Sequence, residues 1–172
     1  MKKKFLPLIL TLLGCGGRSN APTDAPALTA ADWEKTTKIE YRYGDSSVAP
    51  DYHRSYLITI TDSMKTMVID SYGDVLLSKQ YSNTPTDFQI FKEELSKKGI
   101  KKHDETDSGG CCGGTTETLR LYSADAIVFD AYVYHCSGKY GTLFLPDGTA
   151  DFIRSQIPES VDSLINSTFQ ND

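Results

Sequence analysis

The chain of 172 residues lacks any apolar run long enough to cross a membrane as a helix. Its first apolar run, residues 5–13, is less than half of the about 20 residues that such a helix needs. Basic residues are also in the minority, with 18 Lys and Arg against 23 Asp and Glu. The formal charge of −5 argues against non-specific binding to nucleic acid, because that binding needs a basic surface.

The sequence motifs of several enzyme classes are missing as well. There is no Gly-x-Ser-x-Gly of serine hydrolases, no His-Glu-x-x-His of zinc proteases and no Cys-x-x-Cys of thioredoxin-like redox centres. The glycine-rich stretch at residues 109–114 lacks the Lys-Ser/Thr pair of a phosphate-binding loop. We therefore predict a protein that is not an enzyme and has no catalytic residues, metal or cofactor.

Acidic and histidine side chains are the remaining candidates for chemistry. His53 enters a predicted strand, His103 lies in a run of charged residues, and His135 should share the strand face of Val133, which predicts a half-buried ring. Four carboxylates could form a pair of acids, although carboxylates at such positions commonly cap turns: Asp45, Asp51, Asp74 and Glu117.

The N-terminus has the pattern of a secretory signal peptide. Three lysines at positions 2–4 precede the short apolar run, which ends in Leu12-Leu13-Gly14-Cys15. This ending resembles the lipobox of bacterial lipoproteins, and the resemblance implies cleavage before Cys15 and lipidation of that residue. Two or more acyl chains hold a protein stably on a membrane. We therefore expect a lipid-anchored protein of the bacterial cell envelope, on the outer membrane or a periplasm-facing membrane surface.

The segment after the predicted cleavage site has the composition of a linker. Residues 15–31 are rich in Gly, Ala, Pro, Ser and Thr, which predicts a flexible tether. Removal of residues 1–14 would take away three basic residues and no acidic one, so the formal charge would change from −5 to −8. That charge argues against docking on anionic headgroups. The folded part is expected to be one domain at residues 32–169.

Alternating residues predict strands in the first half of this domain. Tyr56, Ile58 and Ile60 recur at every second position, as in a strand with one buried face. Gly-Asp turn signals at residues 44–45 and 73–74 separate short strand-like segments. These connections leave no room for crossover helices and indicate an antiparallel β-meander.

The first helix is expected at residues 86–98. Thr84 is a suitable N-cap, and one apolar stripe is formed by Phe88, Phe91 and Leu95. A glycine after the last turn is the usual left-handed stop.

The second half of the domain predicts a hairpin around a turn at residues 123–125 and a second helix. That helix, at about residues 150–167, should be broken or kinked at Pro158. Strands that are grouped, rather than alternating with helices, predict an α+β fold. We expect the meander and the hairpin to form one sheet, with both helices packed on one face.

The cysteines predict a disulfide. Lipidation of Cys15 leaves Cys111, Cys112 and Cys136, in a compartment where disulfides persist. Adjacent cysteines lack the spacing of a closed zinc site, which needs four ligands. We therefore predict that Cys136 pairs with one neighbour of the Cys111–Cys112 pair and so joins the two strands of the second hairpin.

The register of the hairpin leaves the choice of partner open. If Leu121 faces Ile127, Cys136 faces Cys112. A bulge at the following glycines would bring Cys111 opposite instead.

Several stretches resemble a group of small bacterial lipoproteins of unknown function: YRYGDSSVAPDYHRSY, DSYGD, CCGGTTETLRLY and YVYHCSGKYG. In that group we expect a Cys-x-Gly-Gly-Thr pattern before the hairpin and a Tyr-His-Cys after it. The resemblance covers most of the folded part and implies no chemistry. It places the first cysteine of the pattern at Cys111, which implies a Cys111–Cys136 bond and leaves Cys112 as a thiol or an intermolecular partner.

Ten tyrosines are the most informative excess in the composition. Tyrosine joins a large apolar ring to a polar tip and is enriched in binding surfaces, although aromatic pairs across strands also stabilise sheets. Five tyrosines form the predicted binding surface on the sheet: Tyr41, Tyr43, Tyr122, Tyr132 and Tyr134.

Together these features predict a membrane-anchored extracytoplasmic lipoprotein with a non-catalytic binding or structural domain. Its partner would be a protein or an envelope polymer met by the tyrosine-rich face. The alternative is an inhibitor of an envelope hydrolase that inserts the glycine-rich loop or residues 46–52 into a cleft. An uncharacterised enzyme is the third possibility.

Overall fold

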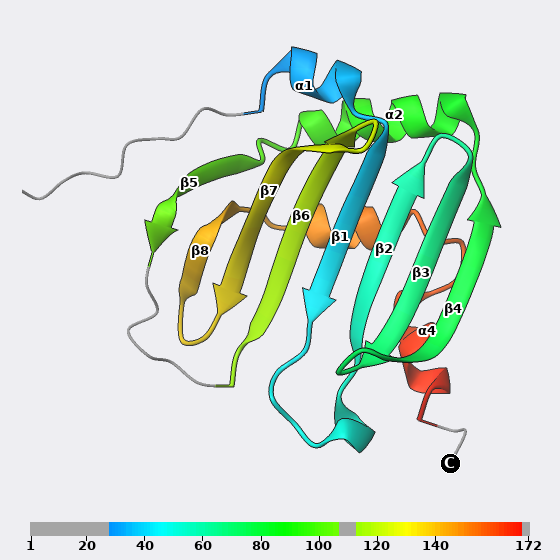
Figure 1. Ribbon diagram of the computed structural model, residues 1–172, viewed down its shortest axis with the longest axis vertical. Coiled ribbons are helices and arrows are strands. Elements are labelled where there is room, and N and C mark those ends of the chain that lie inside the picture. The colour runs from blue at the N-terminus through cyan, green and yellow to red at the C-terminus, as the bar shows by residue number, and fades with distance from the viewer. Residues whose placement is uncertain (1–27, 107–112, 170–172) are drawn as a thin grey trace, which may run out of the picture.

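The computed structural model describes residues 28–106 and 113–169 (Figure 1). Four α-helices are described: α1 (Ala30–Lys35), α2 (Pro85–Ser96), α3 (Thr149–Arg154) and α4 (Val161–Ser167). A short 3₁₀ turn, η1, covers Pro50–Tyr52. The strands are β1 (Lys38–Gly44), β2 (Ser55–Thr61), β3 (Met64–Ser71), β4 (Asp74–Ser82), β5 (Lys101–Thr106), β6 (Thr115–Ser123), β7 (Ala126–His135) and β8 (Lys139–Phe144). No helix in these two ranges is long and apolar enough to span a bilayer.

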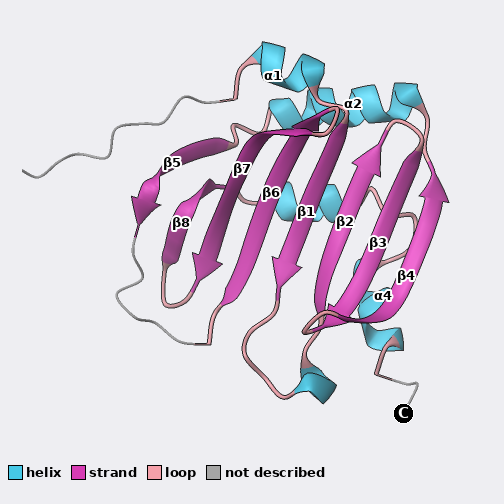
Figure 2. Ribbon diagram, viewed as in Figure 1, coloured by secondary structure: helices cyan, strands magenta, loops and turns pink. Residues whose placement is uncertain are grey.

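All eight strands belong to one sheet with the order β4-β3-β2-β1-β6-β7-β8-β5 (Figure 2). Every pairing in the sheet is antiparallel. The first four strands form the predicted meander, and the predicted second hairpin, β6–β7, pairs with β1. A single sheet with helices confirms the α+β class.

The central helix α2 follows the signals in its sequence. The Thr84 side chain accepts a hydrogen bond from the backbone N–H of Asp87, as an N-cap does. The stripe formed by Phe88, Phe91 and Leu95 is buried, as predicted. Gly99 follows with a φ of +77°, a left-handed conformation that glycine adopts without strain.

One hydrophobic core joins the strands to the helices. The buried side chains of β1 and β2, among them Ile39 and Ile58, belong to the same cluster as Trp33 of α1, Phe91 of α2 and Ile153 of α3. In Figure 1, α3 and α4 lie behind the strands, and α2 runs along the upper ends of the strands.

The structured part begins before residue 32. Helix α1 starts at Ala30, and Thr29 and Asp32 form a capping box in which each side chain accepts a hydrogen bond from the backbone N–H of the other. Leu28 packs against the core. The end of the predicted tether is therefore folded, because the Trp33 ring is buried and holds this turn against the domain.

The run of charged residues around His103 forms strand β5. Its residues read Lys-Lys-His-Asp-Glu-Thr, with no apolar face to signal a strand. It lies at the edge of the sheet and, among the described strands, pairs with β8 alone, so the backbone rather than side-chain burial holds it. The predicted second helix is two short helices, α3 and α4, and the break at Pro158 lies between them, as expected.

The register of the β6–β7 hairpin differs from the predicted one. Leu121 pairs with Phe129 rather than Ile127, because a bulge between Leu121 and Tyr122 shifts the ladder next to the turn. The last described pair is Thr115 with His135. Continued by one residue, this register places Gly114 beside Cys136.

Candidate functional site

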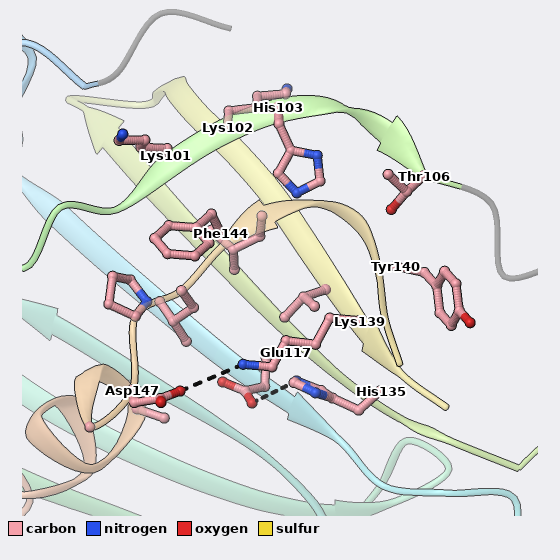
Figure 3. Close-up of a pocket in the computed structure, with 16 residues that line it drawn as sticks. Lys101, Lys102, His103, Thr106, Glu117, His135, Lys139, Tyr140, Phe144 and Asp147 are labelled. Atoms are coloured by element: carbon pink, nitrogen blue, oxygen red, sulfur yellow. Dashed lines mark ion pairs between the residues drawn. The ribbon is translucent and has the colours of Figure 1, made fainter. Parts of the chain in front are cut away.

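A cavity of about 650 Å³ lies between β5, β8 and the start of α3 (Figure 3). That volume is in the range of small-molecule binding sites, about 300–1,000 Å³. We call it the His135 cavity. Its described lining residues are Lys101, Lys102, His103, Thr106, Glu117, Val133, His135, Lys139, Tyr140, Leu143, Phe144, Leu145, Pro146, Asp147, Gly148 and Ala150.

A polar network closes one end of this cavity. The Tyr41 hydroxyl donates a 2.8 Å hydrogen bond to Oε2 of Glu117, and Nε2 of His135 lies 2.9 Å from Oε1 of the same carboxylate. The His135 contact has the distance of an ion pair but not the alignment of a hydrogen bond, and its Nε2 atom is buried. Both oxygens of Glu117 therefore already meet a protein group.

The strand period explains how these residues meet. Glu117 continues the core-facing run of Leu119 and Leu121 on β6, and His135 continues the run through Val133 on β7. On each of these two strands the alternating apolar residues thus end in a polar residue. The two polar residues, Glu117 and His135, lie at the same end of the sheet. The predicted half-buried His135 on the face of Val133 is confirmed.

Burial fixes the protonation of the tyrosines behind Glu117. Desolvation, together with the neighbouring Tyr56 and Glu117, raises the pKa of the Tyr41 hydroxyl far above its usual value. Burial also raises the pKa of Tyr56 to about 12. Tyr41 consequently stays protonated at ordinary pH and serves Glu117 as a donor.

Cations are in excess around the opening of the cavity. Lys101, Lys102 and Lys139 are among the lining residues, against the carboxylates of Glu117 and Asp147. Lys139 approaches Asp147 to 3.6 Å, but the Asp147 side chain is fully exposed.

His103 adds a polar ring from β5. Its Nδ1 lies 2.7 Å from the carbonyl oxygen of Asp104 and donates to it, because a carbonyl can only accept. Figure 3 shows the ring pointing from β5 into the cavity. In residues 28–106 and 113–169, no three His, Cys, Asp or Glu side chains come together as metal ligands would.

The rest of the wall is apolar. Val133 and Leu143 are buried, whereas the ring of Phe144 is 52% exposed. Apolar side chains on one side and charged groups on the other suit a ligand that has both characters.

Two of the five tyrosines predicted to form a binding surface lie on the wrong side of the sheet. Tyr41 is 1% exposed and belongs to the core with Ile39, and Tyr43 packs against that core. The reason is the strand period, since residues 39, 41 and 43 share one face of β1. Tyr41 therefore offers no surface to a partner.

The other three tyrosines of that set lie on the opposite face of β6 and β7, and protein groups hold their hydroxyls. Tyr122 donates to Glu40, Tyr132 donates to Glu105, and Tyr134 accepts from the backbone N–H of Gly114. A second hollow of about 540 Å³ is lined by residues that include Tyr132, Tyr134 and Tyr140.

The other predicted candidates have structural roles or lie apart from the cavity. Asp45 accepts the backbone N–H of Arg54, and His53 accepts the backbone N–H of Tyr72 and stacks on its ring at 3.8 Å between centroids. Asp51 lies in η1, and Asp74 begins β4.

Cys136 is disulfide-bonded. Its predicted partners, Cys111 and Cys112, lie outside the described residues, as does the predicted lipidation site, Cys15. The neighbouring Gly114 packs tightly on this strand end, since a Cβ there would lie 2.2 Å from the His135 carbonyl oxygen and 2.8 Å from Cβ of Cys136. Only glycine fits, and the backbone that follows the cysteine pair is therefore in contact with Cys136.

No family model, curated protein or solved structure matches this chain in the comparisons made with each.

Proposed function

We propose that the protein is a non-catalytic, lipid-anchored binding domain of the bacterial cell envelope and that its ligand occupies the His135 cavity. The observation that supports this most strongly is a cavity of about 650 Å³ with a polar network at one end and an apolar wall. The ligand is a small molecule rather than a flat macromolecular surface, because the cavity is concave and of ligand size.

The core architecture supports this proposal. We infer that α2, α3 and α4 cover one face of the sheet, since their buried residues share a core with the strands. The His135 cavity opens at the edge of that layer, where β5 is the last strand and α3 begins. Ligand sites commonly lie at such junctions of a rigid frame.

The lining residues argue for binding rather than catalysis. His135 contacts a carboxylate, as the base of a hydrolase triad does, but no serine or cysteine is among the described residues that line the cavity. Among the lining residues that the structure describes, the pair therefore has no Ser or Cys of the kind that such a triad activates.

One observation supports the hypothesis that the protein inhibits an envelope hydrolase. The ring of Tyr52, in the loop at residues 46–52, is 70% exposed, and the Tyr72 hydroxyl donates to the carbonyl oxygen of Val48 in the same loop. A protruding loop held in place could enter the cleft of an envelope hydrolase. The tyrosine-rich face of β6 and β7 is the other docking surface, for a protein or an envelope polymer.

Lipidation is tested by labelling cells with a fatty-acid analogue. We expect the wild-type protein to take up the label and Cys15→Ser to lose nearly all of it, because the lipobox-like ending makes Cys15 the acylated residue. N-terminal analysis of the mature protein should find residue 15 first. Equal labelling of both proteins would contradict membrane anchoring through this residue.

Ligand occupancy is tested by filling the cavity. Ala150→Phe adds a ring to the lining, and Ala126→Phe adds the same ring at the exposed start of β7. Native mass spectrometry of protein isolated from its membrane should show a bound small molecule in the wild type and in Ala126→Phe. We expect occupancy at least about tenfold lower in Ala150→Phe. An unchanged bound mass in Ala150→Phe, or none in any of the three, would contradict the proposal.

A further inference from the structure

We infer that the ligand of the His135 cavity is an amphipathic anion, with one carboxylate or phosphate group on an apolar body. This inference depends on the proposed function, because it names the ligand class of the same site. It is carried by the positions of Lys139, His135 and Glu117 and by the apolar wall beside them.

Lys139 and His135 form the headgroup end of the site. They are directly paired across β7 and β8, and both line the cavity. Directly paired residues on antiparallel strands have Cβ atoms about 4.5–5.5 Å apart, so the His135 ring lies beside Lys139. Nε2 of His135 is buried against Glu117, so the Lys139 ammonium is the group that meets the ligand's headgroup.

The acidic groups nearby do not cancel this site. Glu117 is occupied, since one oxygen accepts from Tyr41 and the other contacts His135. Asp147 is fully exposed and 3.6 Å from Lys139, and ion pairs of this kind contribute little. A ligand anion can therefore replace Asp147 at Lys139, whereas a ligand cation would have to compete with Tyr41 and His135 for Glu117.

The other basic side chains of the lining add to the positive electrostatic field of Lys139. Lys101 pairs with Phe144 across β5 and β8, and no ion pair of Lys101 is found among the described residues. The chain as a whole has a formal charge of −5, whereas the cavity lining has three lysines and two carboxylates. Nζ of Lys102 donates to the carbonyl oxygen of Asp130, so Lys101 and Lys139 are the lysines that contribute most to the site. A local excess of positive charge attracts anions at short range even when the protein as a whole is negatively charged.

An apolar body has a place beside the headgroup. Leu143, Phe144 and Leu145 follow one another along the cavity wall, and the Phe144 ring is half exposed. Exposed aromatic surface next to a cavity is stabilised when an apolar ligand covers it. The tail of the ligand therefore lies against β8 and the segment that leads to α3.

Three probes with the same tail separate the contribution of charge from that of apolar contact. Decanoate, decan-1-ol and decyltrimethylammonium are titrated into the isotope-labelled mature protein below their micelle-forming concentrations, and amide shifts of the cavity residues are followed by NMR. Hydrogen bonds to charged groups contribute about 1.5–3 kcal/mol, which corresponds to roughly ten- to a hundredfold in affinity. Decanoate should therefore bind at least about tenfold tighter than decan-1-ol, and the cation should bind most weakly.

Single variants place the headgroup. Lys139→Gln should weaken decanoate about tenfold and leave decan-1-ol unchanged, whereas Lys97→Gln, on the exposed end of α2, should change neither. Decyl phosphate is titrated in parallel with decanoate. Tighter binding of decyl phosphate assigns a phosphate headgroup to the ligand, and tighter binding of decanoate assigns a carboxylate. Acetate should bind far more weakly than decanoate, because it lacks the tail.

The outcomes distinguish the two proposals. Equal affinity for the three decyl probes, tighter binding of the cation, or no effect of Lys139→Gln on decanoate would overturn the assignment of an anion while leaving a cavity that binds ligands. Failure of all the probes to shift the cavity residues would overturn the cavity as a binding site.

Discussion

Replacing Phe91 by alanine is expected to lower the free energy of unfolding by about 3–5 kcal/mol, the usual loss for a core aromatic residue. Phe91 is 2% exposed and stacks on Phe152 with 5.6 Å between ring centroids. Its removal leaves a cavity between α2 and α3 and removes apolar area from the core. Urea denaturation, followed by circular dichroism, measures the change directly.

The matched control lies one position away on the same helix. Ile90 is 54% exposed, so Ile90→Ala should change the free energy of unfolding by no more than about 0.5 kcal/mol. If Phe91→Ala changed stability as little as Ile90→Ala, helix α2 would not cover the sheet.

Cys136→Ser should lower the free energy of unfolding by about 3–4 kcal/mol. Cys136 is disulfide-bonded, and a bond to Cys111 or Cys112 closes a loop of about 25 residues, for which loop entropy gives this magnitude. It is a large share of the roughly 5–15 kcal/mol that stabilises a small domain. Urea denaturation without reducing agent is the measurement.

The two candidate partners are told apart by their own variants. One of Cys111→Ser and Cys112→Ser should match Cys136→Ser, and the other should be nearly silent because its thiol is not bonded. Peptide mapping without reduction identifies the bonded pair. A Cys111–Cys112 bond, or stoichiometric zinc, would contradict the pairing across the hairpin.

Local sequence signals were sufficient for the parts of the fold that depend on local physics. The cap at Thr84, the stripe of Phe88, Phe91 and Leu95, and the alternation of Ile58 and Ile60 each predicted a described element and its buried face. Each signal depends on neighbours within one or two turns or on the period of a single strand.

Pairings between distant segments could not be predicted in the same way. Strand β5 has no apolar face, and its partner β8 is about 40 residues further along the chain. The His135 cavity lies where these two strands meet the start of α3, so a sequence reading that misses both strands also misses the cavity.

The binding-surface prediction failed at Tyr41 because the face of β1 that Tyr41 shares with Tyr43 is the one that faces the core. Ile39 and Tyr41 share the period of a buried face, and that signal was present in the sequence. A similar signal identifies the polar network, because Glu117 and His135 are the polar residues that end two core-facing apolar runs. A polar residue at such a position needs a partner, and here the two supply each other.

The central claim, that the His135 cavity holds the ligand, is tested most directly by photo-crosslinking in cells. The photoreactive residue p-benzoylphenylalanine is placed singly at Phe144 beside the cavity, at Tyr122 on the sheet face and at Tyr52 on the protruding loop. Mass spectrometry of the recovered lipoprotein should show a crosslinked small molecule at position 144 and none at the other two. A captured protein or polymer at position 122 or 52, with nothing at 144, would contradict the account.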